Sequence, residues 1–454
     1  MLIYLSIAFF LYAIAPTDYS YSFCFIVQLL FFANAVCLYM YDRSKESIGF
    51  NVIFSISFYC MFFLYPLFVY PIAPDFSFFS HGFNTQVINK CVALAFFAYA
   101  CYSVGYFYSS QIEKKRTDAF YVKDILNPRI INVLVILSFF FFCVFVCSGG
   151  LSYFSNQYRG DTSDASPITA YSYLFVQVFV VLLMLTFLLE GHSMQKKVVI
   201  AILICVVLLL LMVGTRTLPL SILIIAFYML NIKYKFSTAK IFVFGLVGMA
   251  LMIVIGAIRH AGVGNASSDD LMGGGEGNLG FLGFFVDVIV ISYNYYVLYD
   301  YTCMNSILAG LNLVSPILAI VPFSQSVFVS AFDVPPYMLD SPNFATFLVL
   351  GEGSTVGLGS NIVGDAYLAF GLFGVVIMFG VLGYVVAYFR NRFLTGELWG
   401  TIIYLQLVGG AFYMVRASMI GGFREYIWSI VIFNIITRCL LKNKMSDISN
   451  IESR

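Results

Sequence analysis

The chain of 454 residues is 61% hydrophobic, 18% aromatic and only 10% charged, with a mean hydropathy of +0.92. This composition excludes a soluble globular protein, because so much apolar surface could not be kept in water. It predicts an all-α polytopic membrane protein, since long apolar runs favour helices over barrel strands. The net charge of +1 points to no class of partner, and no nucleic-acid partner is expected.

Apolar segments predict about twelve transmembrane helices. The first run has no basic leader and no cleavage site, so we expect it to stay as a helix. Several runs approach the roughly 20 residues that a spanning helix needs. The twelve segments cover residues 2–15, 20–41, 50–72, 89–109, 130–148, 169–189, 198–214, 218–232, 241–258, 363–388, 399–415 and 426–441.

The distribution of basic residues predicts the orientation of these helices. Eighteen of the 24 Lys and Arg residues fall in loops that lie on one side of the membrane if the amino terminus is cytoplasmic. The positive-inside rule therefore predicts cytoplasmic termini at both ends. The other six basic residues face outward, and all but one are arginines: Lys90, Arg159, Arg216, Arg259, Arg416 and Arg424. Arginine holds phosphate through a planar, permanently charged fork, so this pattern indicates an outward-facing site for a phosphorylated ligand.

The predicted organisation has four parts. Nine helices occupy residues 1–258, a large outer loop occupies 259–362, three helices occupy 363–441, and a cytoplasmic tail occupies 442–454. The loop begins with a glycine-rich stretch and continues with two apolar segments long enough to cross the membrane. Their polar and proline residues favour interfacial or re-entrant helices, and two further crossings would give fourteen.

Four arginines are candidates for binding pyrophosphate. Arg216 stands between two apolar runs that leave almost no loop, which indicates either snorkelling to headgroups or a functional intramembrane charge. Arg259, followed by the candidate base His260, ends the next predicted helix. Arg416 and Arg424 flank an outer turn. If the four side chains converge, they would neutralise a pyrophosphate; the alternative is pairing with headgroups or with helix ends.

Several acids are candidates for proton transfer. Glu425 follows Arg424 directly, and Glu352 and Asp365 lie in the segment that begins at Leu350. A helix that starts at Asn361 or Gly364 leaves Asp365 near its positive end, where it could stabilise the helix dipole, hold an arginine or act as a base.

Candidate glycan-binding residues lie in two segments. Arg159 and Tyr158 belong to a polar, aromatic outer loop, and Asn361 precedes Asp365. Amides and aromatic rings suit sugar recognition, although exposed loops often have this composition without a function. The ten cysteines and three histidines show no metal-ligand spacing, so no metal and no cofactor are expected.

In the residues of two motifs, the chain resembles the O-antigen polymerases, the Wzy-type oligosaccharide repeat-unit polymerases. The motifs are GTR at Gly214–Arg216 and GSNIVGDAYLAFGLFG at Gly359–Gly374, within a similar plan of ten to fourteen helices and one large late loop. The resemblance implies a GT-C-like glycosyltransferase of the bacterial inner membrane with a periplasmic active site. It also implies that Arg216 binds the pyrophosphate of an undecaprenyl-linked oligosaccharide.

The resemblance further implies partners in the same pathway, namely a flippase and a chain-length regulator. Two alternatives stay open at this point. An O-antigen ligase is the nearest enzyme, but its relatives tend to carry a histidine where this chain has Ser360-Asn361-Ile362. A lipid-linked oligosaccharide flippase is the non-enzyme alternative, although it would be expected to place cations along the membrane interior rather than on one face.

Overall fold

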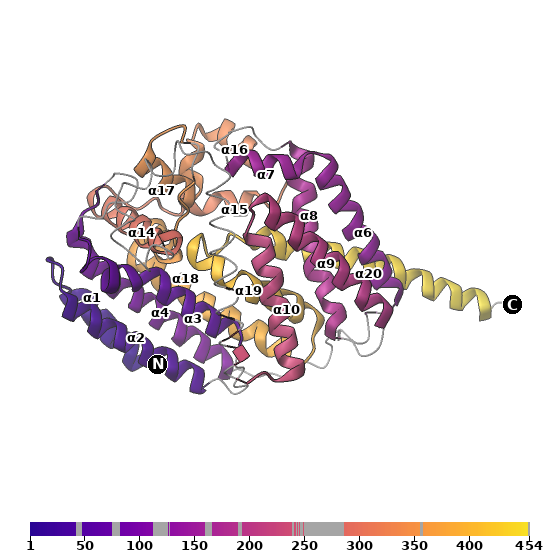
Figure 1. The fold of residues 1–454 in the computed structure, drawn as a ribbon, viewed down its shortest axis with the longest axis horizontal. Helices are drawn as coiled ribbons and strands as arrows, with labels where there is room; N and C mark the ends of the chain where they lie inside the picture. The colour runs from indigo at the N-terminus through magenta and orange to yellow at the C-terminus, as the bar shows by residue number, and fades with distance from the viewer. Residues whose placement is uncertain are drawn as a thin grey trace. The chain divides into compact units, whose positions relative to one another are not determined.

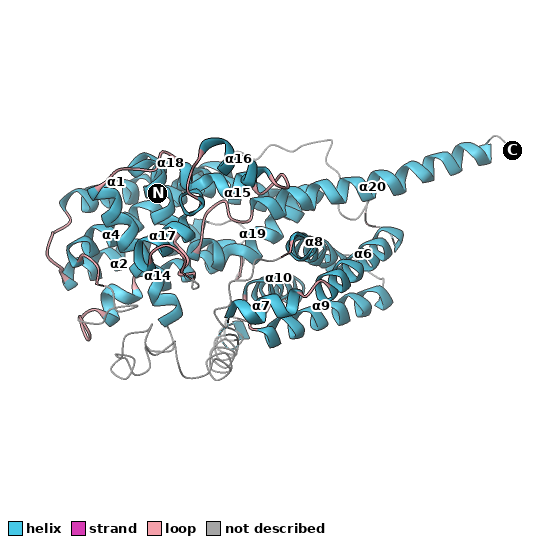
Figure 2. Ribbon diagram, turned by 90° about the horizontal axis from the view of Figure 1, so that it is seen from above, coloured by secondary structure: helices cyan, strands magenta, loops and turns pink. Residues whose placement is uncertain are grey.

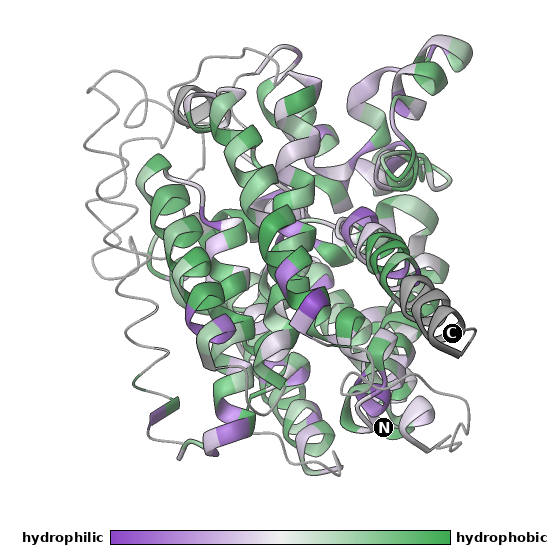
Figure 3. Ribbon diagram, turned by 90° about the vertical axis from the view of Figure 1, so that its right-hand side faces the viewer, coloured by the Kyte–Doolittle hydropathy of each residue, from purple (hydrophilic) through white to green (hydrophobic). Residues whose placement is uncertain are grey.

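A computed structural model shows a chain of helices over the residues that it describes (Figure 1). It describes residues 1–41, 48–74, 82–111, 128–158, 166–188, 193–237, 286–354 and 357–452, together with isolated residues between these ranges. Over these ranges no strand is present (Figure 2). The helices are predominantly apolar along their length, as the hydropathy colouring shows (Figure 3). The prediction of an all-α protein is therefore confirmed.

Eight described helical segments are long and apolar enough to cross a membrane. They are Tyr21–Tyr41, Thr85–Ser110, Pro128–Cys147, Pro167–Leu188, Met194–Val213, Thr217–Tyr234, Ile362–Leu394 and Leu398–Arg416. These segments support a polytopic membrane protein, and each corresponds to one of the twelve apolar runs. The predicted helix at 241–258 lies largely outside the described residues, and the total number of crossings stays a prediction.

The chain divides into two compact units, and each is described by itself. The first comprises Met1–Glu113, Phe236–Tyr388 and Ala411–Gly422. Its helices include α1 (Leu2–Ile14), α2 (Tyr21–Tyr41), α3 (Phe50–Phe62), α4 (Ile88–Gln111), α14 (Val286–Met304), α15 (Val314–Leu318), α16 (Ser324–Phe332), α17 (Ser341–Leu350) and most of α18 (Ile362–Leu394). Within it, α4 packs against α1 and α2, while α14 contacts α3 and α17.

Glycines allow α4 and α18 to pack closely in the first unit. A Cβ atom added to Gly105 would lie 2.0 Å from the carbonyl oxygen of Gly380, and one added to Gly383 would lie 2.0 Å from that of Tyr102. Such backbone proximity is typical of helix pairs in membranes. There the helices associate through close van der Waals packing, which small residues allow. The first unit thus holds α18 directly against the buried helix α4.

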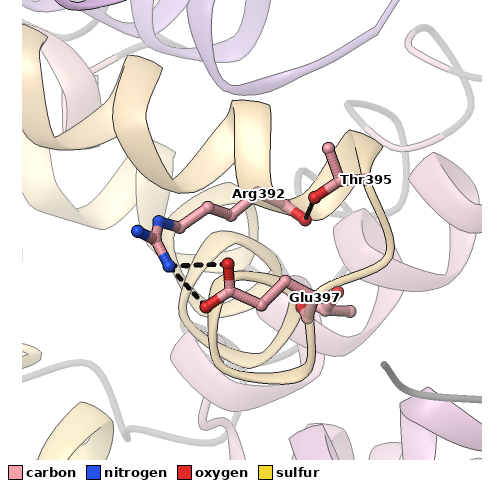
Figure 4. A network of polar contacts seen from close by, with 4 residues as sticks. Arg392, Thr395 and Glu397 are labelled. Carbon is pink, nitrogen blue, oxygen red and sulfur yellow. Dashed lines mark hydrogen bonds and ion pairs between the residues drawn. The ribbon is translucent and has the colours of Figure 1, made fainter. Parts of the chain in front are cut away.

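The second unit comprises Lys114–Lys235, Phe389–Gly410 and Phe423–Arg454. It contains α6 (Pro128–Cys147), α7 (Gly150–Tyr158), α8 (Pro167–Met184), α9 (Ser193–Val213), α10 (Thr217–Tyr234), the first part of α19 (Leu398–Arg416) and α20 (Phe423–Glu452). Helix α8 packs against α6, α10 and α20. Arg392 pairs with both carboxylate oxygens of Glu397, at 2.5 and 2.6 Å, across the turn between α18 and α19 (Figure 4).

Much of the loop predicted at 259–362 is helical where it is described. Helix α14 has 19 residues, and the apolar stretch after it is divided into α15 and α16, of 5 and 9 residues. Neither of these two helices is long enough to cross a bilayer alone. Between Asp300 and Asp333 there is no charged residue, which suits a segment in contact with the bilayer.

Candidate functional site

The beginning of α18 is built by a glycine turn and an asparagine cap. Gly359 has a φ of +75°, a conformation that side-chain-bearing residues rarely adopt. Asn361 then accepts a hydrogen bond from the Gly364 amide at Oδ1, at 2.6 Å, so it caps the helix that starts at Ile362. Of the two predicted starting points, Asn361 and Gly364, the structure has the helix begin at Asn361, and Asp365 lies in its first turn as predicted.

Asp365 is fully buried and accepts hydrogen bonds from three separate segments. One oxygen accepts from Ser341 at 2.5 Å and from Asn312 at 2.9 Å. The other accepts from Ser418 at 2.7 Å, and the Met419 amide also donates to the carboxylate. All four donors are neutral. Asp365 therefore joins the first turn of α18 to the start of α17, to the turn before α15 and to the turn after α19.

The charge of Asp365 acts on a neighbouring acid. Asp340 is half-buried immediately before α17, and the Asn343 amide donates to one of its carboxylate oxygens at 3.3 Å. Burial, followed by the negative charge of Asp365, raises the pKa of Asp340 to about 7. The entry to α17 thus carries an acid that titrates near neutral pH.

Three buried polar atoms beside Gly359 have no hydrogen-bond partner among the described residues. They are Asn294 Oδ1, Ser360 Oγ and Asn361 Nδ2. Asn294 donates through Nδ2 to the carbonyls of Leu358 and Gly359, at 2.9 and 3.2 Å, which places it against this turn. Such groups normally find a partner, so this cluster is unusual for a purely structural turn.

Arg416 lies at the same turn. Its carbonyl accepts the Ser360 amide at 3.2 Å, and its Nε lies 3.9 Å from the position that a Cβ of Gly359 would take. The side chain is half-buried. The first unit therefore brings Arg416, Asn361 and Asp365 together, three of the residues that the sequence predicts for the site.

Helix α18 is broken one turn beyond Asp365. Phe370 and Gly371 have non-helical backbone angles, with a φ of +62° at Gly371. The carbonyls of Leu368 and Ala369 instead accept the amides of Leu308 and Gly310, at 2.8 and 3.1 Å. The short first part of α18 is thus capped at both ends by segments of the same unit, which fixes Asp365 in place.

The GTR motif forms the turn between α9 and α10 in the second unit. Gly214 has a φ of +96°, the Gly214 amide bonds Leu211 and the Thr215 amide bonds Leu210, which is a Schellman helix end. The Thr215 hydroxyl also donates to the Leu210 carbonyl at 3.0 Å. Arg216 is the N-cap of α10 and is half-buried. A guanidinium and a helix amino terminus together favour an anion.

Arg424 and Glu425 lie in the first turn of α20, also in the second unit. Arg424 pairs with Glu425 at 3.3 Å, with side-chain exposures of 31% and 20%. The Gln406 amide donates to the Glu425 carbonyl, which ties this turn to α19. Arg216 and Arg424 thus belong to one unit and Arg416 to the other.

The other predicted site residues are exposed or lie wholly or partly outside the described residues. Glu352 is exposed in the segment after α17. Tyr158 is the last residue of α7, and its side chain is not described. Arg159, Arg259 and His260 lie outside the described residues, so their predicted roles stay predictions.

Comparison with protein families matches residues 1–446 to the family described as O-antigen polysaccharide polymerase Wzy. The chain belongs to this family. The match spans nearly the whole chain and confirms the resemblance predicted from its motifs. No curated protein and no solved structure matches the chain.

Membership in the Wzy family places the chain among transferases of surface polysaccharide biosynthesis.

Five polar residues that surround Asp365 and Gly359 were not predicted from the sequence as members of the site. Each lies in a segment that is otherwise apolar or rich in glycine. The only indication of a role in the sequence was that an uncharged polar residue stands alone in such a segment. The five are Asn294, Asn312, Ser341, Ser360 and Ser418.

Proposed function

We propose that this Wzy-family protein polymerises undecaprenyl-pyrophosphate-linked oligosaccharide repeat units at the periplasmic face of the inner membrane. The observation that carries the proposal is the family match over residues 1–446. A sugar hydroxyl of one lipid-linked repeat attacks the anomeric carbon of the other chain. The bond from that carbon to the pyrophosphate oxygen breaks, undecaprenyl pyrophosphate leaves, and the hydroxyl proton is lost to a base.

The leaving pyrophosphate would be held by arginines. Arg216 offers a guanidinium at the amino terminus of an 18-residue helix. Arg416, the last residue of α19, is half-buried beside the turn that precedes α18. Charge that develops on a departing pyrophosphate is stabilised by such fixed cations. Arg259 and Arg424 are the other two candidate phosphate ligands that the sequence predicts.

The proton acceptor must be a carboxylate or a neutral imidazole that the attacking sugar hydroxyl can reach. Both oxygens of Asp365 are engaged by neutral donors, whereas Glu352 is exposed. We assign proton transfer to Glu352, with His260 as the other candidate base, and a positioning role to Asp365. Glu425 holds Arg424 through their ion pair.

Asn361 is proposed to contact the glycan, and Tyr158 and Arg159 stay the other candidate glycan-binding residues predicted from the sequence. The polymerase would work in the bilayer beside a flippase that supplies the lipid-linked repeat and a regulator that sets chain length. These partners, cytoplasmic termini and a periplasmic site follow from the proposed reaction together with the one-sided distribution of basic residues.

The test is complementation of a deletion strain, with surface lipopolysaccharide separated on a silver-stained gel. The wild-type chain should restore a ladder, whereas Arg216→Ala and Glu352→Gln at equal expression should leave core plus a single repeat. Arg438→Ala is the matched control, because Arg438 is an exposed arginine on the predicted cytoplasmic side. Loss of all capped lipopolysaccharide in the deletion strain would point to a ligase or flippase, and an unchanged ladder would refute the proposal.

A further inference from the structure

The turn that begins α18 contains an incomplete set of hydrogen bonds. Asn294, Ser360 and Asn361 are each 0% exposed, and each has one polar atom without a partner in the described part of the chain. We propose that these three residues form the binding site for hydroxyl groups of the acceptor sugar, beside Arg416. This inference rests on the proposed polymerase function and extends it to a defined subsite.

The contacts already made by these residues place all three at one turn of the chain. Asn294 bonds the carbonyls of Leu358 and Gly359, and Ser360 and Asn361 are the next two residues of the chain. The Ser360 amide is fixed by the Arg416 carbonyl, and Asn361 Oδ1 is fixed by the Gly364 amide. Each residue thus uses one polar group to build the turn and keeps another.

The chemistry of the unpaired atoms selects the ligand. Asn294 Oδ1 only accepts, Asn361 Nδ2 only donates, and Ser360 Oγ does both. A phosphate at neutral pH offers mainly acceptors and would leave Asn294 Oδ1 unpaired. Sugar hydroxyls both donate and accept, so adjacent hydroxyls of one ring can satisfy all three atoms. Arg416 next to them suits the negative charge of a neighbouring pyrophosphate.

The free energy that the unpaired atoms cost the folded protein is an argument for a ligand that pairs with them. Each buried polar atom without a partner costs about 1–3 kcal/mol. The carboxylate of Asp365, one turn away, is by contrast engaged by four donors. Because the three residues are fully buried, a sugar reaches them only after a local rearrangement.

The variant Ser360→Ala distinguishes a sugar-binding role of the hydroxyl from a structural role, because the two roles predict different effects on activity and on stability. The hydroxyl has no partner in the described chain, so its removal should leave thermal stability unchanged or slightly increased. If it binds the sugar, kcat/KM for a lipid-linked repeat should fall roughly ten-fold, the effect of losing about one hydrogen bond. The assay is chain extension by the full-length protein in lipid nanodiscs.

The matched control is Ser138→Ala in α6, whose Oγ is also buried without a partner among the described residues. It should affect stability in the same way as Ser360→Ala and leave activity unchanged. Asn361→Ser is a second variant, because serine also caps a helix but lacks the amide donor. It should reduce kcat/KM while the far-UV spectrum and the melting temperature stay close to wild type.

Two outcomes would overturn the subsite. One is full activity of Ser360→Ala under conditions where Arg416→Ala is inactive. The other is a clear loss of stability in Ser360→Ala, which would show that the hydroxyl binds a buried water only. Failure of the wild-type protein to extend any chain would instead overturn the proposed function, so the two failures are distinguishable.

Discussion

Replacing Asp365 with asparagine should destabilise the protein, because the carboxylate only accepts hydrogen bonds and the amide does not. Four donors meet its two oxygens: Asn312, Ser341, Ser418 and the Met419 amide. In Asp365→Asn, one oxygen becomes an NH₂ group that faces two of these donors. A serine hydroxyl can turn to accept, but an N–H group cannot.

The magnitude follows from counting these bonds. One orphaned donor costs about 1–3 kcal/mol, and the bonds that remain lose their charge assistance, at about 0.5–1 kcal/mol each. Removing a buried charge offsets part of this sum, because carboxylate burial is itself unfavourable. We therefore expect a net loss of about 2 kcal/mol, measured as a lower melting temperature of the protein in nanodiscs.

A second substitution separates positioning from catalysis. In Asp365→Asn with Asn312→Asp, the carboxylate moves to residue 312 and can accept from the new amide and from Ser341. Part of the stability and of the polymerase activity should return. If Asp365→Asn were as stable as wild type but inactive, and the double variant stayed inactive, Asp365 would act as the base and the positioning role would be refuted.

Two further predictions concern packing and pH. Gly383→Ala should lower the melting temperature or prevent accumulation, because its Cβ would lie 2.0 Å from the Tyr102 carbonyl oxygen; normal stability would mean that α4 and α18 do not pack this closely. The raised pKa of Asp340 means that its contribution to stability is fully present below about pH 4 and lost as pH rises through about 7. Asp340→Asn should therefore raise stability at pH 8 but not at pH 4, by about 1–2 kcal/mol after allowance for solvent screening, and a pH-independent difference between the melting curves would contradict this.

Much of the helical framework could be predicted because membrane helices leave a strong local signal. The boundary between α9 and α10 is an example: two apolar runs meet at Gly214, whose positive φ ends one helix and allows the next to begin at Thr217. The break in α18 at Phe370 was not predicted. It depends on the amides of Leu308 and Gly310, some 60 residues earlier, which replace the lost helical bonds.

The site could be predicted only in its charged residues. Arginines and acids stand out in an apolar chain, and Asn361 was one of two predicted starting points of its helix. Ser341 and Ser418, however, reach Asp365 from 24 and 53 residues away. Such pairings are made by tertiary packing, and no local spacing indicates them.

The way Asp365 is held bears directly on the proposed reaction. A carboxylate paired with Arg416 would neutralise the guanidinium and weaken its attraction for pyrophosphate. Here neutral hydroxyls and amides hold the carboxylate, while Arg416 contributes its backbone carbonyl to the same turn. Arg424, in contrast, already shares its charge with Glu425. The turn after α19 is therefore fixed without an ion pair between Asp365 and Arg416, and this favours Arg416 over Arg424 as the proposed phosphate ligand.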